Sequence, residues 1–197
     1  MIHFDYFPSR VYRDERPDLA QQVLPISNVR FDEVRNINDP ICQTPHLGNE
    51  ADLRQLSDYL LLSAGNILRE QGYMVEKYDF YVSGLLGQEI KQNSHTQRHV
   101  QKNSQICGWF FLEVPDPGAT AVYYDTRINK SMIELDFEQQ ENIEFATSSI
   151  HFDNMQPGTV LFSNSWMEHQ LTGSTSEQPT KCIYFTISHR DILCNMY

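Results

Sequence analysis

The feature that most restricts the fold of this chain is a change of pattern after Gly72. Beyond that residue the chain breaks into short segments rich in β-branched and aromatic residues. The expected strands are residues 73–86, 106–114, 121–124, 143–152, 159–162 and 181–188. Turn signals such as Pro115-Asp116-Pro117-Gly118 and Gln156-Pro157-Gly158 separate them. Short strands at this spacing predict an all-β sandwich or a jelly-roll barrel.

The segment before Gly72 divides into two parts. In residues 50–71 apolar side chains recur at helical spacing, namely Leu53, Leu56, Leu60, Ala64, Ile67 and Leu68. Asn49 suits the N-cap of this helix and Gly72 suits its end. Residues 1–48 carry scattered prolines and short apolar pieces, so we expect an irregular segment with an edge strand.

A chain of 197 residues is long enough for one domain with a sizeable core. We therefore expect a single domain over residues 1–197. In this interpretation residues 1–72 form an N-terminal wrap and one flanking helix, and residues 73–190 form the jelly-roll barrel. The fold class is mainly β.

The charge balance argues against one class of partner. The chain has 26 acidic and 15 basic side chains and a formal net charge of -11. A surface of that sign repels the phosphate backbone, so we expect no binding to nucleic acid.

The cysteines and the apolar segments bear on localisation. The four cysteines are widely spaced and form no Cys-x-x-Cys pair, which favours reduced thiols in the cytoplasm. The N-terminus lacks a signal-peptide pattern. No apolar segment approaches the roughly 20 residues needed to cross a bilayer, so we expect no membrane association.

Two histidines have positions that suit a metal site. His169 follows the apolar strand 159–162 after a short corner, and His99 precedes the apolar segment 106–112. In an extended chain His95, His99 and Gln101 face the same side, because side chains alternate along a strand. Each histidine alone also fits an ordinary surface position. Two histidines at strand ends of a jelly roll together suit Fe, Zn, Cu or Ni.

Three segments resemble the Fe(II)- and 2-oxoglutarate-dependent oxygenases, in particular their phage and bacterial type. The segment from His99 to Leu112 resembles the first metal-binding strand, in which the family has His-x-His, six residues, and then glycine and aromatics. A second family pattern, Pro-Gly-x-x-x-Phe-x-x-x-Trp-x-x-His, is matched by Pro157, Gly158, Phe162, Trp166 and His169. The strand 181–188 resembles the one that carries a basic residue for 2-oxoglutarate. The resemblance spans residues 78–189 and implies a double-stranded β-helix, the cupin-like jelly roll.

The resemblance also implies cofactors and roles. Fe(II) would be held by His99, Gln101 and His169, and 2-oxoglutarate would pair with Lys181 through its distal carboxylate. The family usually has arginine at that last position, and lysine offers a point charge where arginine offers a fork. Tyr81 would either hydrogen-bond 2-oxoglutarate or serve as a core or rim aromatic. The implied reaction is the hydroxylation of an unidentified small-molecule or protein substrate.

Gln101 departs from the family pattern, which has Asp, Glu or a second His at this place. A neutral amide oxygen is a poor ligand for Fe(II). The third metal position could be filled in three ways: Gln101 binds weakly through its carbonyl, an external anion takes the position, or His95 reaches in along the same face. In a further alternative the site is lost, and the barrel is an inactive binding or assembly module. A cupin-like enzyme with another metal is the third reading.

Overall fold

The computed structural model describes residues 9–36, 38–127 and 147–191, and it contains two antiparallel β-sheets. The large sheet has the order β1-β7-β4-β9-β3-β2 and the small sheet the order β6-β5-β8. The large sheet consists of β1 (Val11–Glu15), β2 (Ile41–His46), β3 (Tyr78–Ile90), β4 (Ile106–Glu113), β7 (Thr159–Asn164) and β9 (Thr180–Asp191). The small sheet consists of β5 (Thr120–Tyr124), β6 (Ser149–Phe152) and β8 (His169–Thr172).

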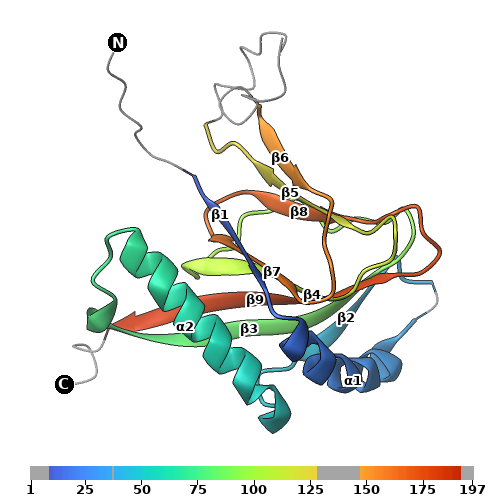
Figure 1. Ribbon diagram of the computed structural model, residues 1–197, viewed down its shortest axis with the longest axis horizontal. Helices are drawn as coiled ribbons and strands as arrows, with labels where there is room; N and C mark the ends of the chain where they lie inside the picture. Colours follow the sequence, from blue (N-terminus) through green and yellow to red (C-terminus); the bar gives the residue numbers. More distant parts are fainter. Residues whose placement is uncertain (1–8, 37, 128–146, 192–197) are drawn as a thin grey trace.

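The helices and the small sheet cover opposite faces of the large sheet (Figure 1). The helices are α1 (Pro17–Val34) and α2 (Arg54–Glu70), with short 3-10 turns η1 (Ala51–Leu53) and η2 (Val75–Lys77). The mainly β jelly-roll fold expected from the sequence is therefore confirmed.

The strand β9 contributes to two separate cores. Ile183 and Phe185 pack toward the helices, whereas Cys182 and Tyr184 pack toward the small sheet. The central strand β4 divides its side chains in the same way. Both strands are covered on both faces in the centre of the sheet, which explains why β4 is almost continuously apolar and why β9 is apolar from Cys182 to Phe185.

The helix expected over residues 50–71 is confirmed as η1 followed by α2. All six apolar residues that predicted it are buried against the large sheet. Gly72 ends the helix with a φ of 91°, and its N–H donates to the Arg69 carbonyl at 3.0 Å. The Tyr73 N–H donates to the Leu68 carbonyl at 3.0 Å, which completes a Schellman motif. Asn49 is not the N-cap, because Leu53 occupies that position in α2.

The N-terminal segment corrects the expectation of an irregular wrap. Its described part contains β1, α1 and β2, and the two strands form the edges of the large sheet. Pro17 opens α1, where a missing N–H costs no hydrogen bond. Pro25 lies inside the helix and hid its pattern in the sequence. The buried side chains nevertheless recur at helical spacing, at Leu19, Ala20, Val23, Ser27 and Phe31.

The strand predictions hold best in the centre of the sheets. Residues 106–114, 121–124, 159–162 and 181–188 correspond to β4, β5, β7 and β9. Strand β3 begins later than expected, at Tyr78, because η2 precedes it. The expected strand 143–152 lies partly outside the described residues, and its last part is β6. The sequence did not predict β8.

The turn Pro157-Gly158 joins the barrel to α1. Gly158 has a φ of 102°, and its carbonyl accepts a hydrogen bond from the Arg16 N–H at 2.7 Å. A Cβ atom at this position would lie 2.5 Å from the Pro17 nitrogen. Glycine is therefore required both by the backbone conformation and by the close approach of α1.

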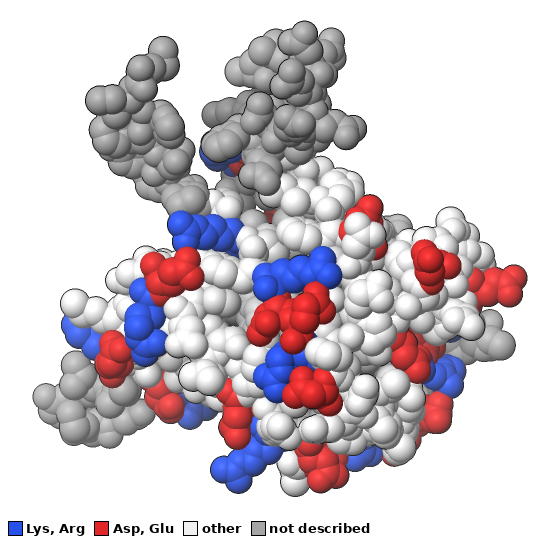
Figure 2. Space-filling model, viewed as in Figure 1, with Lys and Arg blue, Asp and Glu red and all other residues white. Residues whose placement is uncertain are grey.

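Charges of both signs are interspersed on the face of the molecule seen in Figure 2. Within the described segments, the helices are too short or too polar to cross a membrane.

We expect Leu60→Ala to destabilise the protein by about 2–5 kcal/mol, because it leaves a cavity between α2 and the large sheet. Leu60 is fully buried, whereas Leu62 in the same helix is 66% exposed. Leu62→Ala is thus a matched control and should change stability by no more than about 0.5 kcal/mol. Urea unfolding of both variants measures the difference. Equal destabilisation would contradict the packing of α2 described above.

Candidate metal centre

The backbone places His99 and His169 side by side. The His99 N–H donates to the His169 carbonyl at 3.1 Å, and the His169 N–H donates to the His99 carbonyl at 3.0 Å. The two imidazole rings lie 4.5 Å apart between centroids. His169 begins β8, while His99 lies in the irregular segment 91–105 between β3 and β4. That segment is not the extended strand considered above, because it makes only isolated bridges at His95 and His99.

Both imidazoles are oriented by backbone carbonyls. The Nδ1 atom of His99 lies 2.8 Å from the Gln97 oxygen, and the Nδ1 atom of His169 lies 2.7 Å from the Met167 oxygen. A carbonyl only accepts, so in each neutral ring the proton is on Nδ1 and a lone pair remains on Nε2. This is the tautomer that metal-binding histidines adopt when a carbonyl holds the other nitrogen.

Both Nε2 atoms and the Gln101 amide oxygen surround the Tyr184 hydroxyl. The Tyr184 oxygen lies 3.1 Å from His169 Nε2 and 3.4 Å from His99 Nε2. It lies 3.3 Å from Gln101 Oε1. The structure therefore brings together the three residues that the sequence indicated as metal ligands.

Burial keeps His169, Tyr184 and Cys107 in defined protonation states. It lowers the pKa of His169 to about 4, so the ring is neutral near pH 7. Burial also raises the pKa of the Tyr184 phenol far above its usual range. The nearby Cys107 thiol, 3.8 Å from His169 Nε2, has a pKa raised by burial to about 11. His99 and Gln101 are partly exposed, so the group opens toward solvent on their side.

These atoms fit a metal ion that accepts nitrogen and oxygen ligands. Two imidazole lone pairs and one amide oxygen point to a common region, and neutral imidazole is a common ligand of iron. The described residues contain no group of three His, Cys, Asp or Glu side chains placed to hold a metal. Among the described residues, the oxygen donors found together with the two histidines are the Gln101 amide and the Tyr184 phenol.

Two buried donors beside His169 lack partners. The Trp109 ring lies 5.2 Å and the Tyr123 ring 6.1 Å from the His169 ring, between centroids. In the described part of the chain, neither Trp109 Nε1 nor the Tyr123 hydroxyl makes a hydrogen bond. Burial raises the pKa of the Tyr123 phenol, which therefore remains a donor. Unpaired buried donors are costly, and an acceptor such as a carboxylate would satisfy them.

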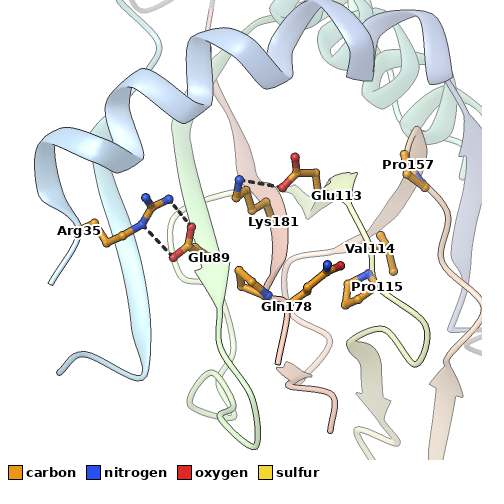
Figure 3. A pocket seen from close by; sticks show the side chains of 9 residues that line it. Arg35, Glu89, Glu113, Val114, Pro115, Pro157, Gln178 and Lys181 are labelled. Carbon is orange, nitrogen blue, oxygen red and sulfur yellow. Dashed lines mark hydrogen bonds and ion pairs between the residues drawn. The ribbon is translucent and has the colours of Figure 1, made fainter. Parts of the chain in front are cut away.

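Lys181 lies on the other face of the large sheet. It is three residues from Tyr184 in a regular part of β9, so the two side chains point to opposite sides. Its ammonium group lies 2.7 Å from Glu113 and 2.8 Å from the Asn28 amide oxygen of α1. Lys181 and Glu113 line a pocket of about 620 Å³ beneath α1 (Figure 3). The structure does not bring Lys181 to the histidines.

The other residues considered in the sequence also lie apart from the centre. Tyr81 pairs with Ser188 on β9, four residues from Tyr184 or about 13 Å of strand. Its ring is covered by Arg190 at 4.5 Å. His95 is exposed and bridges Thr172 through its backbone.

Tyr184 and Cys107 also belong to the centre, and neither was predicted from the sequence. Both lie in apolar strands whose two faces are buried, so burial did not distinguish their side from the helix side. The signal was a tyrosine between the apolar residues Ile183 and Phe185 of β9. Only the pairing of β9 with β4 shows that this hydroxyl faces the histidines.

The chain matches the model of the family described as "Putative 2OG-Fe(II) oxygenase" over residues 88–186. A search of curated proteins gives no match. Solved structures show the same fold at low sequence identity. HygX from Streptomyces hygroscopicus, solved with nickel and 2-oxoglutarate, has a TM-score of 0.58 at 10% identity. The alignment covers 91% of this chain and 83% of HygX.

Two further structures align over a similar extent. A Pseudomonas putida prolyl-4-hydroxylase has a TM-score of 0.56 at 11% identity, covering 90% of this chain and 92% of that one. The epimerase SnoN, in complex with Fe3+, alpha ketoglutarate and nogalamycin RO, has a TM-score of 0.57 at 10% identity. That alignment covers 91% of this chain and 79% of SnoN. The family model spans half of the chain and includes His99, Gln101 and His169, and the chain belongs to this 2OG-Fe(II) oxygenase family.

Proposed function

We propose that the chain is a non-haem iron, 2-oxoglutarate-dependent dioxygenase that hydroxylates its substrate. His99 and His169 hold the iron through Nε2, and Gln101 is the third ligand through its amide oxygen. The observation that supports this assignment is the convergence of these three atoms around one hydroxyl. The two backbone carbonyls that fix the histidine tautomers add to it.

The residues around the centre prepare it for oxidative chemistry. In the family, iron and 2-oxoglutarate supply a reaction that consumes O2, adds a hydroxyl group to the substrate and releases succinate and CO2. His169 remains a neutral ligand near pH 7 because it is buried. Trp109, Tyr123 and Tyr184 enclose its ring with aromatic surface and exclude water from the inner side.

We propose that Trp109 Nε1 and the Tyr123 hydroxyl donate hydrogen bonds to a carboxylate of 2-oxoglutarate. Both offer a buried donor beside His169, and a carboxylate accepts from such donors. Lys181 is not included, because its ammonium group is paired with Glu113 on the other face of the sheet.

The substrate, a small molecule or a protein, approaches from the side of His99 and Gln101. This side is the open one, since His169 and Tyr184 are buried. Val100 is 43% and Trp166 46% exposed, and the Gln101 N–H donates to the Ser165 carbonyl at 3.0 Å. An apolar rim of this kind favours a substrate with an apolar surface.

The net charge and the free cysteines bear on the substrate class and the compartment. The net charge of -11 argues against a nucleic-acid substrate. Cys42, Cys107 and Cys182 are free and buried, which suits a reducing compartment such as the cytoplasm.

We expect His169→Ala to lower the affinity for Fe(II) at least about 100-fold, since even changes outside the metal ligands typically cost 10–100-fold. His151→Ala is the control, because His151 is exposed on β6 and should leave the affinity unchanged. Anaerobic calorimetry with 2-oxoglutarate present measures both. A wild-type protein that binds no Fe(II) at micromolar concentration would instead support the inactive binding or assembly module.

Restoring a stronger ligand should tighten the site. We expect Gln101→His and Gln101→Asp each to raise the affinity for Fe(II) by about tenfold or more, because both replace a neutral amide with a preferred ligand. Lys102→Asp controls for added negative charge, since Lys102 is exposed one residue along the chain. If neither Gln101 variant binds more tightly than the wild type, Gln101 is not at the metal position.

Tyr123→Phe should weaken 2-oxoglutarate binding to the Fe(II)-loaded protein by about tenfold or more, the cost of one hydrogen bond to a charged group. Tyr124→Phe is the matched control, because Tyr124 is the next residue of β5 and points to the other side. Calorimetric titration with 2-oxoglutarate under anaerobic conditions gives both affinities. Equal affinities in the two variants would remove Tyr123 from the cosubstrate site.

A further inference from the structure

The Tyr184 hydroxyl is surrounded by more acceptors than it can satisfy. It lies 3.1–3.4 Å from His99 Nε2, His169 Nε2 and Gln101 Oε1. The hydroxyl carries one proton and can donate it to only one of them. Each Nε2 atom presents a lone pair, because Nδ1 donates to a carbonyl. At least one lone pair therefore faces the phenol oxygen without a hydrogen between them.

The other groups nearby do not remove this excess. The Gln101 amide nitrogen donates to the Lys102 carbonyl at 3.3 Å, which leaves its oxygen as the acceptor. The Cys107 thiol is a weak donor 3.8 Å from His169 Nε2 and is also in contact with Ser163. A group of electron pairs that lacks protons is satisfied by a cation.

The separations also suit neighbouring ligands of one ion. Metal–nitrogen and metal–oxygen bonds of about 2.0–2.2 Å place adjacent ligands roughly 3.0 Å apart at octahedral angles and roughly 3.4 Å apart at tetrahedral angles. The three distances from the Tyr184 oxygen, 3.1, 3.3 and 3.4 Å, fall in this range.

The charge of the centre indicates which donor is needed. Two imidazoles and one amide give a ligand set with no negative charge, whereas iron sites of this class contain one carboxylate. Glu168 next to His169 in sequence pairs with Arg98 instead. Tyr184 is the group in contact with all three donors that can become an anion there.

We infer that Tyr184 is itself a metal ligand and supplies, as a phenolate, the negative charge that Gln101 does not. The inference rests on the proposed function, since it adds a ligand to the same site. On binding, the Tyr184 O–H bond breaks, an oxygen–metal bond forms, and the proton leaves to solvent. The neutral Gln101 oxygen is the weaker of the two oxygen donors.

The test compares Tyr184→Phe with Gln101→Ala. We expect Tyr184→Phe to lower the affinity for Fe(II) at least about tenfold and more than Gln101→Ala does, because it removes the charged ligand. Tyr124→Phe, which keeps the Tyr184 phenol, should bind like the wild type. Anaerobic titration of the full chain with Fe(II) alone measures these affinities.

A spectrum provides a readout that does not depend on folding of a variant. One equivalent of Fe(II) is bound by the wild-type protein and then oxidised to Fe(III) by O2. Coordination by Tyr184 predicts a phenolate-to-iron charge-transfer band in the visible, which is present in Tyr124→Phe and absent in Tyr184→Phe. Iron bound without this band, and equally well by Tyr184→Phe, overturns the Tyr184 assignment and leaves the proposed function intact. A wild-type protein that binds no iron overturns both.

Discussion

The two backbone hydrogen bonds between His99 and His169 join the parts of the molecule on which the candidate centre depends. They tie an irregular segment, residues 91–105, to the first residue of β8. Backbone pairing sets the distance between the rings before any side chain is oriented, and the carbonyls of Gln97 and Met167 then fix the direction of each ring. The main chain thus sets both the separation and the direction of the two rings.

Strand β9 connects this centre to the rest of the fold. Alternate side chains of the strand enter two different cores, so Tyr184 reaches the histidines while Ile183 and Phe185 pack under the helices. The position of the Tyr184 hydroxyl therefore depends on helix packing more than 100 residues away in sequence. The charged pocket beneath α1, with Lys181 and Glu113, lies on the helix side of the same strand. One strand thus separates a charged surface from an aromatic interior.

The sequence was most informative where one physical signal dominates. The apolar stripe from Leu53 to Leu68 predicted α2, and the apolar strands with their turns predicted the jelly roll. Pro25 concealed α1, because local proline chemistry outweighed a helical stripe of modest strength. The strand-end positions of His99 and His169 suggested a shared site, and the family resemblance implied the ligand set of His99, Gln101 and His169. The face on which a β9 side chain lies depends on strand pairing. Neither the place of Tyr184 beside the histidines nor the distance of Lys181 from them could therefore be predicted from the sequence.

The segment 91–105 is attached to the barrel mainly through its main chain, by bonds from Thr96, His99 and Gln101 to Leu171, His169 and Ser165. Arg98 and Val100, between these anchors, and Lys102, directly after them, are exposed. Positions that hold the donors therefore alternate with exposed positions, of which Val100 belongs to the apolar rim described above. In such a segment the outward residues can diverge among relatives and change what is recognised, while the inward residues keep their geometry. The residues of the candidate metal centre and the exposed residues that could contact a substrate therefore belong to the same short segment.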